Sequence, residues 1–249
     1  MTRTVLVTGG AKRVGAAIVR HLAGKGHRVV IHYGRSRDAA VALAEAVGGA
    51  AVGCDLADRA VVATLIDEAA TLVGAPIDGL VNSASLFEFD RPPLDDWALL
   101  ERLAPVNLGA PVLLASALAR QPGIADGAVV NLLDQKVANL NPDFFSYTCT
   151  KVALAGATEM LARALAPVVR VNAVAPGLTL PSGDQTPAEF DAVARENLLG
   201  RPVDIDEIGR AVEFLLTARS VTGQTLFVDS GQRFLPRGGY VMFETRERP

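Results

Sequence analysis

Three ionisable side chains in this sequence have types and spacing that suggest proton-transfer chemistry. Tyr147 and Lys151 stand four residues apart, and Asp134 stands thirteen residues before the tyrosine. Positions i and i+4 share one face of a helix, so we expect the ammonium of Lys151 near the phenol of Tyr147. A free tyrosine, with a pKa of about 10, exchanges protons poorly at neutral pH. A neighbouring cation stabilises the phenolate, so we expect Lys151 to lower the pKa of Tyr147 toward the working range.

Each of these residues also has an ordinary structural interpretation. A tyrosine four residues before a lysine occurs by chance on many helix surfaces, and an acid that ends a strand is often only a turn or cap residue. For Asp134, the spacing to Tyr147 favours a catalytic role.

Composition limits the classes of protein to which the chain can belong. It has 249 residues, of which 50% are hydrophobic, and this is enough for one globular domain spanning 1–249. A net charge of -3 argues against a nucleic-acid-binding face. Cys54 and Cys149 lie apart with no CxxC pattern, which argues against a disulfide framework or a metal site. We see no apolar signal region and no run of about eighteen apolar residues, and we expect a cytoplasmic protein without membrane contact.

Short β-rich runs alternate with longer helical patterns along the chain. This alternation predicts a parallel sheet covered by helices on both faces. The irregular stretch 177–188 is either a plain connection or, as its length favours, a substrate loop. The predicted strands are 4–8, 28–33, 50–54, 79–82, 128–133, 168–174 and 224–228, and the predicted helices are 14–24, 36–47, 58–73, 94–118, 145–166 and 204–216.

A glycine-rich turn joins the first strand to the first helix. It reads Thr-Gly-Gly-Ala-Lys-Arg-Val-Gly and includes Gly9, Arg13, Val14 and Gly15. Glycines permit a tight turn and close backbone approach to a pyrophosphate, while the helix N-terminus offers free N–H groups. A structural turn is the alternative, but its place after the first strand of an alternating chain favours dinucleotide binding.

The end of the second strand suggests which dinucleotide binds. NAD-binding proteins commonly carry an acid here for the ribose 2′-hydroxyl, and this chain has none. It has instead His32, Arg35 and Ser36, with Arg13 in the nearby turn. A guanidinium pairs with phosphate in a bidentate manner, so we predict NADP(H) rather than NAD(H). A solvated basic turn is the alternative.

Together these segments resemble the short-chain dehydrogenase/reductase family, from Thr4 to about Gly231. The resemblance implies a doubly wound Rossmann fold with a seven-stranded parallel sheet, helices on both faces and assembly as a homotetramer. The matching segments are the turn 8–15, Cys54-Asp55-Leu56, Asn82-Ser83-Ala84-Ser85, Asn107, the pair Tyr147 and Lys151, and Pro176-Gly177.

Within that family the chain looks most like the pteridine reductases. Arg13 stands where the common pattern has a glycine, and Asp134 stands where it has a serine. The segment 32–36, His-Tyr-Gly-Arg-Ser, is similar to their 2′-phosphate segment. The segment 82–87, Asn-Ser-Ala-Ser-Leu-Phe, is similar to the one that contacts the pterin, although Ser83 departs from its asparagine.

The resemblance assigns a role to individual residues. It implies that Asn107 forms a helix bulge with a water link to Lys151, that Asp55 bonds the adenine, and that Phe87 stacks on the pterin. The implied cofactor-binding residues are Gly9, Arg13, Val14, Gly15, His32, Tyr33, Arg35, Ser36, Asp55, Leu56, Asn82, Ser83, Ala84, Tyr147, Lys151, Pro176, Gly177, Leu178 and Thr179. The implied substrate-binding residues are Arg13, Ser85, Phe87, Asp134, Phe144 and Tyr147.

The expected activity is NADPH-dependent hydride transfer to a C=N bond of an oxidised pterin or dihydrofolate. A carboxylate at 134 cannot donate a hydrogen bond unless protonated, but it accepts from the N–H groups of a heterocycle. The alternatives are a reductase of a quinone, imine or ketone, and a nucleotide-binding regulator without turnover. The sequence assigns no role to the tail 237–249.

Overall fold

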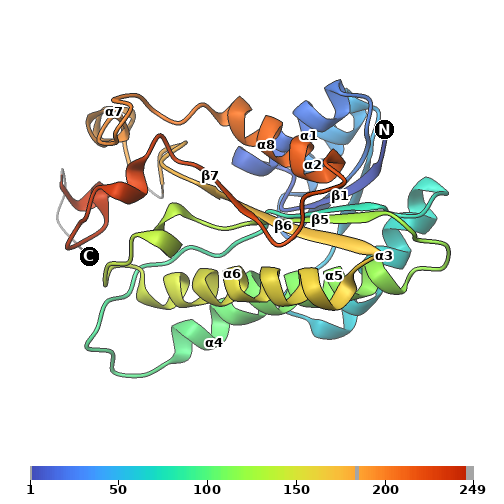
Figure 1. The fold of residues 1–249 in the computed structure, drawn as a ribbon, viewed down its shortest axis with the longest axis horizontal. Helices are drawn as coiled ribbons and strands as arrows, with labels where there is room; N and C mark the ends of the chain where they lie inside the picture. The colour runs from blue at the N-terminus through green and yellow to red at the C-terminus, as the bar shows by residue number, and fades with distance from the viewer. Residues whose placement is uncertain (1, 183–184, 245–249) are drawn as a thin grey trace.

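The computed structural model describes residues 2–182 and 185–244, which form one seven-stranded sheet between two helical layers (Figure 1). All strand pairs are parallel, in the order β3-β2-β1-β4-β5-β6-β7. Val7 pairs with Ile31 on one side and with Val81 on the other, so β1 lies inside the sheet, next to the central strand β4. The strands are β1 (Thr4–Thr8), β2 (Arg28–Tyr33), β3 (Ala50–Gly53), β4 (Gly79–Asn82), β5 (Gly127–Leu132), β6 (Val169–Pro176) and β7 (Thr225–Val228).

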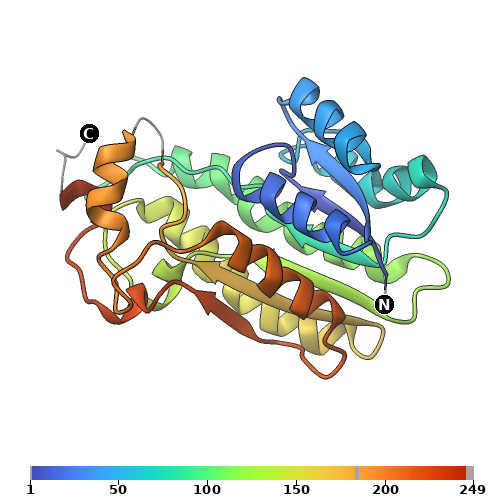
Figure 2. The ribbon, with the colours of Figure 1, turned by 90° about the horizontal axis from the view of Figure 1, so that it is seen from above.

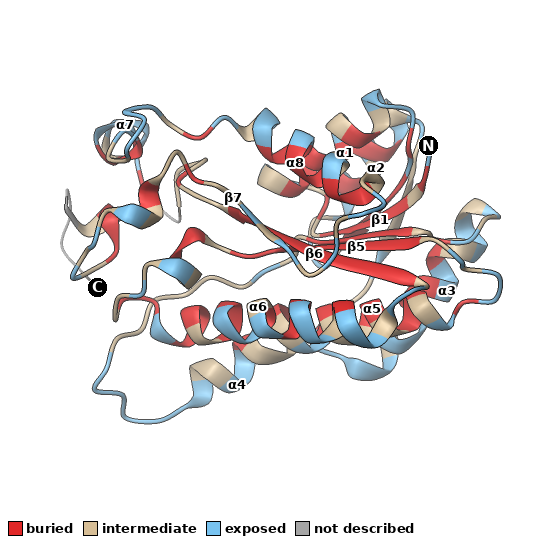
Figure 3. Cartoon of the chain, in the orientation of Figure 1, coloured by how far each residue is buried: buried red, intermediate tan, exposed pale blue. Residues whose placement is uncertain are grey.

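The helices divide between the two faces of the sheet. Figure 2 looks onto the face that α1, α2 and α8 cover, while α3, α4, α5 and α6 lie on the other face. Each face has its own buried apolar cluster, and Figure 3 shows the buried sheet between the two layers. The helices are α1 (Arg13–Gly24), α2 (Arg37–Val47), α3 (Arg59–Val73), α4 (Ala98–Ala104), α5 (Ala110–Arg120), α6 (Phe145–Leu165), α7 (Pro187–Ala194) and α8 (Ile205–Thr217).

The doubly wound parallel fold predicted from the sequence is confirmed, with two differences in the helices. The predicted helix 94–118 begins only at Ala98, and a π-helical turn at Pro105–Gly109 separates α4 from α5. Helix α7 was not predicted, because it begins in a stretch rich in proline, serine and threonine. Thr186 and Glu189 start it by capping each other's backbone N–H groups.

The continuous helical run Ala98–Arg120 also differs from the expectation of no long apolar span. By length and composition alone it is long and apolar enough to cross a membrane. Leu103, Leu114 and Leu118 of this run have no exposed surface, and two of them, Leu114 and Leu118, belong to the core under the sheet. Packing against the sheet therefore accounts for much of its apolar character.

The turn after β1 meets the turn after β4, where the strand order reverses. The hydroxyl of Thr8 accepts the backbone N–H groups of Ser83 and Ala84, at 3.0 and 3.1 Å. A Cβ on Gly9 would lie 2.8 Å from the Cα of Ala84, and one on Gly15 would lie 2.2 Å from the carbonyl oxygen of Gly9. Ligands of open α/β sheets bind at such a reversal, so this close backbone packing shapes the expected nucleotide site.

Substitution of Gly15 tests how tightly this turn is built. Gly15→Ala would place its methyl against the Gly9 carbonyl, so the turn must open. We expect the NADPH dissociation constant to rise about tenfold or more, since overpacking typically costs about 1–3 kcal/mol. Gly24→Ala, in the same helix with no heavy atom within 4 Å of the new Cβ, is the matched control. Fluorescence titration with NADPH measures both, and equal affinities of the two variants would contradict the account.

Candidate active site

The side chains of Asp134 and Tyr147 meet beyond the carboxyl end of β5. Asp134 follows that strand and caps a short 3-10 helix (Gln135–Ala138), and Tyr147 lies in the first turn of α6. The Tyr147 hydroxyl donates to Oδ2 of Asp134 at 3.1 Å. Asp134 keeps partial exposure, while only 6% of Tyr147 is exposed. A proton can therefore move between this phenol and this carboxylate without leaving the protein.

The pKa of Tyr147 moves in the direction opposite to that expected from Lys151. Burial, which disfavours the phenolate, raises it well above the usual value, and the negative charge of Asp134 raises it further. Tyr147 is thus a neutral phenol that donates its hydrogen bond. Burial also raises the pKa of Asp134, although several interactions oppose this effect.

Lys151 lies on the same face of α6 as Tyr147, as the spacing predicted. Its ammonium donates to the carbonyl oxygen of Leu132 at 2.8 Å and lies 5.6 Å from the centroid of the tyrosine ring. Burial lowers the pKa of Lys151 to about 8, and the charge of Asp134 opposes this change. The lysine is therefore mostly a cation at neutral pH, held on β5 rather than at the phenol oxygen.

Asn107 lies within the π-helical turn, so the helix bulge implied by the resemblance is confirmed. Its amide donates to the Leu86 carbonyl at 2.9 Å and to the Thr150 hydroxyl at 3.1 Å. Its oxygen accepts from the Leu86 N–H and from the Ser85 hydroxyl. Asn107 thus joins the loop after β4 to α6, and its water link to Lys151 stays a prediction.

An aromatic cluster covers the same end of α6. The rings of Phe87 and Phe144 stack with centroids 4.1 Å apart, and Phe87 meets Tyr147 edge to face at 4.7 Å. Phe144 has a left-handed backbone conformation, with φ of 54°, and precedes the first residue of α6. One face of Phe87 therefore lies on Phe144, and a flat heterocycle that stacks on Phe87 must use the other face.

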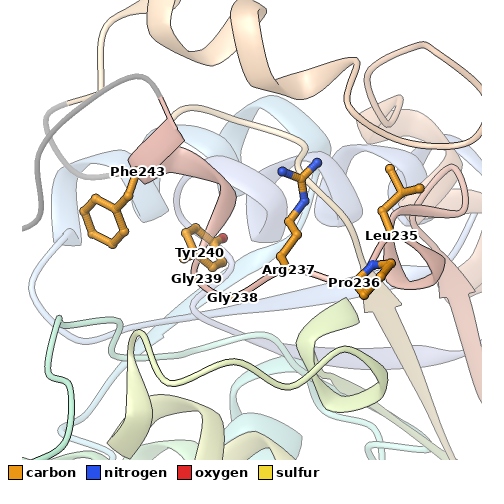
Figure 4. Close-up of a pocket in the computed structure, with 7 residues that line it drawn as sticks. All are labelled: Leu235, Pro236, Arg237, Gly238, Gly239, Tyr240 and Phe243. Carbon is orange, nitrogen blue, oxygen red and sulfur yellow. The ribbon is translucent and has the colours of Figure 1, made fainter.

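The C-terminal segment completes this cluster, which the sequence analysis did not foresee. Tyr240 and Phe243 lie 5.1 and 5.9 Å from Phe144, centroid to centroid. They also line a cavity of about 460 Å³ with the segment from Leu235 to Gly239 (Figure 4). Tyr240 stands 93 residues after Tyr147, so no local spacing connects it with the site.

Two further residues near the site were also missed. Lys136 and Asp143 are fully buried between β5 and α6. The available signal was the charge of Lys136 two residues after Asp134, in the segment between the predicted strand 128–133 and the predicted helix 145–166. Asp143 accepts from the backbone N–H of Tyr240 at 2.7 Å and pairs with Arg91, so it anchors the C-terminal segment.

The basic residues expected around a 2′-phosphate lie on the surface after β1 and β2. Arg13 and Arg35 are exposed, and Ser36 is half-buried at the start of α2. Arg13 has φ of 54°, which explains why a glycine suits this position in the common pattern. Its guanidinium donates to the Pro181 carbonyl at 2.7 Å and so ties the turn to the loop after β6.

His32 differs from the expected phosphate ligand, because its ring lies inside the protein. It is 2% exposed; Nδ1 accepts the Gly9 N–H at 3.2 Å, and Nε2 lies 3.1 Å from the Cys54 carbonyl. Burial lowers the pKa of His32, so the ring is neutral and uses one nitrogen as acceptor and the other as donor. The imidazole therefore fixes the glycine-rich turn from behind.

Several other predicted cofactor residues hold the backbone at this edge of the sheet. The Asn82 amide donates to Asn131 Oδ1 at 2.8 Å, whereas its own Oδ1 is buried without a hydrogen-bond partner. Asp55 is exposed and accepts from the Ala57 N–H. Leu56 is buried, and Tyr33 is half-buried, with its ring against Gly53.

The predicted residues after β6 bring the loop toward the segment that follows β7. A Cβ on Gly177 would lie 2.9 Å from the Cα of Asp229. The Leu178 N–H donates to Gln232 Oε1, and the Thr179 hydroxyl donates to the Gly177 carbonyl. Pro176 ends β6. Part of the predicted substrate loop, residues 183–184, lies outside the described residues.

These features fit a dinucleotide phosphate. Helix α1 begins beside Gly9, and no side chain caps its N-terminus, so its first N–H groups face the turn. The close approaches at Gly9 and Gly15 bring bare backbone to this point, and the guanidinium groups of Arg13 and Arg35, at the start of α1 and after β2, are exposed. The chain thus offers what a pyrophosphate and a ribose phosphate require.

Known proteins resemble this chain over almost all of its length. The family model described as Enoyl-(Acyl carrier protein) reductase matches residues 9–233. The crystal structure of FolM alternative dihydrofolate reductase 1 from Brucella suis, in complex with NADP, is 43% identical, with a TM-score of 0.90, and covers 94% of this chain and 96% of that one. Dihydromonapterin reductase of Klebsiella pneumoniae is 28% identical over 92% of this chain and 96% of its own. The 3-oxoacyl-[acyl-carrier-protein] reductase FabG of Staphylococcus aureus is 32% identical over 93% and 98%.

Replacing His32 tests its role behind the glycine-rich turn. His32→Leu leaves the Gly9 N–H without its acceptor, which typically costs about 1–3 kcal/mol. We expect the NADPH dissociation constant to rise about tenfold. His27→Leu is the matched control. The His27 imidazole is also buried and accepts a backbone N–H, that of Arg3 at 3.1 Å, but it precedes β2 and so lies at the edge of the sheet away from the glycine-rich turn. Calorimetric titration with NADPH compares the two, and a wild-type affinity in His32→Leu would contradict the assignment.

Proposed function

Because the chain belongs to the short-chain dehydrogenase/reductase family and is an NADP-dependent oxidoreductase, we propose that its substrate is an oxidised pterin. The proposed reaction is hydride transfer from NADPH to a C=N bond of a dihydropterin or of dihydrofolate. The names of the FolM and dihydromonapterin reductase relatives support this substrate class.

One observation carries the proposal: the group that accepts the hydrogen bond of the Tyr147 hydroxyl is a carboxylate. Asp134 Oδ2 accepts from the tyrosine hydroxyl at 3.1 Å, where a serine would present a second hydroxyl. A hydroxyl can donate to a ketone oxygen, whereas an ionised carboxylate can only accept. An acceptor suits a ring with N–H and amino groups, as in a pterin, better than it suits a simple carbonyl.

The residues of the chain then have separate tasks. NADPH supplies the hydride when it is bound. Tyr147, a neutral phenol, delivers the proton to the substrate nitrogen, and Asp134 holds the phenol in place and accepts from the heterocycle. Lys151 keeps a cation next to the pair and would hold the nicotinamide ribose. Asn107 fixes the loop that carries Ser85 and Phe87, which we propose as substrate contacts.

For the cofactor, we propose that Arg35, Ser36 and Arg13 bind the 2′-phosphate and that the turn from Gly9 to Gly15 binds the pyrophosphate. Both arginines are exposed, Arg13 at the start of α1 and Arg35 just after β2, and this supports the first assignment. The uncapped N-terminus of α1 supports the second. The homotetramer and the cytoplasmic location expected from the sequence stay predictions.

A second candidate is reduction of a 3-oxoacyl thioester or another ketone. It is favoured by the name of the FabG relative and by the description of the matching family model. The acid at position 134 argues against it, since the expected hydroxyl donor is missing. A regulator without turnover is less consistent with Asp134, Tyr147 and Lys151 together, because binding alone needs no proton donor.

Tyr147→Phe tests the proton donor. The variant loses the hydroxyl that bonds Asp134 but keeps the ring that contacts Phe87. We expect kcat to fall by about 10²–10⁴-fold, the usual contribution of a general acid, while NADPH affinity stays near that of the wild type. Stopped-flow absorbance at the NADPH band measures the loss. An unchanged kcat would remove Tyr147 from the mechanism.

Asp134 variants test the substrate class. Asp134→Ala should cut reduction of dihydrobiopterin and dihydrofolate by about 10²-fold or more, because the acceptor is lost. Asp134→Ser should raise ketone or quinone reduction relative to pterin reduction, because it restores a donor. Steady-state NADPH oxidation with each substrate gives the ratios. If the wild-type enzyme reduces ketones well but reduces no pterin or folate, the proposed substrate class is wrong, and the protein is an NADPH-dependent reductase of other substrates.

A further inference from the structure

Lys136 is a buried cation beside the candidate site to which the mechanism above gives no task. It lies two residues after Asp134, in the 3-10 helix that Asp134 caps, and its side chain has no exposed surface. Its backbone N–H donates to Oδ1 of Asp134 at 2.9 Å. Tyr147 uses the other oxygen, Oδ2. Each carboxylate oxygen therefore has its own donor, and the carboxylate plane is fixed.

The ammonium of Lys136 makes hydrogen bonds to neutral oxygens. It donates to Asn141 Oδ1 at 3.1 Å and to the backbone carbonyl of Asp143. It also lies 5.3 Å from the ring centroid of Tyr240. A buried ammonium costs several kcal/mol unless it is compensated, and an apolar side chain would fill this space at lower cost. The charge itself therefore needs an explanation beyond packing.

Lys136 acts on Asp134 through its backbone N–H and through its charge. Burial is the largest effect on the pKa of Asp134 and raises it. The N–H of Lys136 and then its ammonium oppose burial most, ahead of the Tyr147 hydrogen bond and Lys151. Burial lowers the pKa of Lys136 to about 8, so it is mostly charged at neutral pH. Asp143 and Asp90 also face this ammonium, and Asp143 in turn pairs with Arg91.

We infer that Lys136 is a positioning residue that holds Asp134 as an ionised, fixed acceptor for the Tyr147 hydroxyl, an inference that rests on the proposed function of the Asp134 and Tyr147 pair. The backbone N–H of Lys136 sets the orientation of the carboxylate, and its ammonium stabilises the negative charge. Lys151 then acts next to Tyr147 and on the nicotinamide ribose. Each of the two buried lysines thus serves a different partner of the Asp134 and Tyr147 pair.

Lys136→Met tests this inference, since it removes the charge and keeps the length and the apolar stem. Loss of the cation should raise the pKa of Asp134, so the acidic limb of the kcat/KM profile should move to higher pH. On that limb the kcat/KM of the variant should be about tenfold or more below that of the wild type. At higher pH, where Asp134 is ionised in both proteins, the two values should converge. Lys136→Arg should restore most of the wild-type profile. The NADPH dissociation constant should stay unchanged in both variants.

Arg91→Met is the matched control, because it also removes a cation bonded to Asp143 but not one that acts on Asp134. Its pH profile should keep the wild-type limb. If Lys136→Met lowers activity equally at every pH, or Arg91→Met moves the limb as far, Lys136 is only structural.

A measurement without substrate separates this inference from the proposed function. The pH titration of the Asp134 carboxyl carbon is measured by NMR in protein labelled with ¹³C at aspartate. Its signal is identified as the one that is missing in Asp134→Asn. Lys136→Met should titrate at higher pH than the wild type, and equal titration would overturn the inference. If the wild type reduces no pterin or folate, the proposed function fails, but this comparison still decides the role of Lys136.

Discussion

The candidate site depends on a single, partly buried hydrogen bond, the one that the Tyr147 hydroxyl donates to the Asp134 carboxylate. Burial makes both ionised forms costly, so the phenol stays protonated and the carboxylate needs compensation. That compensation comes from donors and cations on two segments: the 3-10 helix after β5, and helix α6, whose Lys151 is held by a β5 carbonyl. The surrounding hydrogen bonds and aromatic contacts hold this pair in place and shield it partly from water.

The parallel strands bring the pair and the nucleotide turn to the same edge of the sheet. The carboxyl ends of β1, β4, β5 and β6 meet at one edge of the sheet, and polar side chains lock their loops. Thr8 holds the segment after β4, His32 holds the glycine-rich turn, and Asn107 holds Leu86. Helix α7 and the C-terminal segment then pack at the same end of the molecule, as Figure 1 shows, through Phe190, Val193 and Val241. The rigid sheet thus carries loops whose side chains converge on one place.

The sequence predicted much of this arrangement because its strongest signals are local. The alternation of strands and helices gave β1, β2 and β4 with their observed bounds, and the four-residue spacing placed Lys151 on the face of Tyr147. The roles of His32 and Tyr240 depend on partners far away in the chain, which no spacing reveals. The direction of the Tyr147 pKa depends on burial and on the charge of Asp134, and neither can be read from the spacing to Lys151. Helix α7 was missed because its capping residues also favour loops.

A crystal structure of the protein with NADP⁺ and a non-reducible pterin or folate analogue would test the central claim most directly. The account predicts the heterocycle against Phe87, with its nitrogen atoms within about 2.6–3.2 Å of both the Asp134 carboxylate and the Tyr147 hydroxyl. A complex in which Tyr147 contacts the ligand while Asp134 bonds only to protein groups would contradict it.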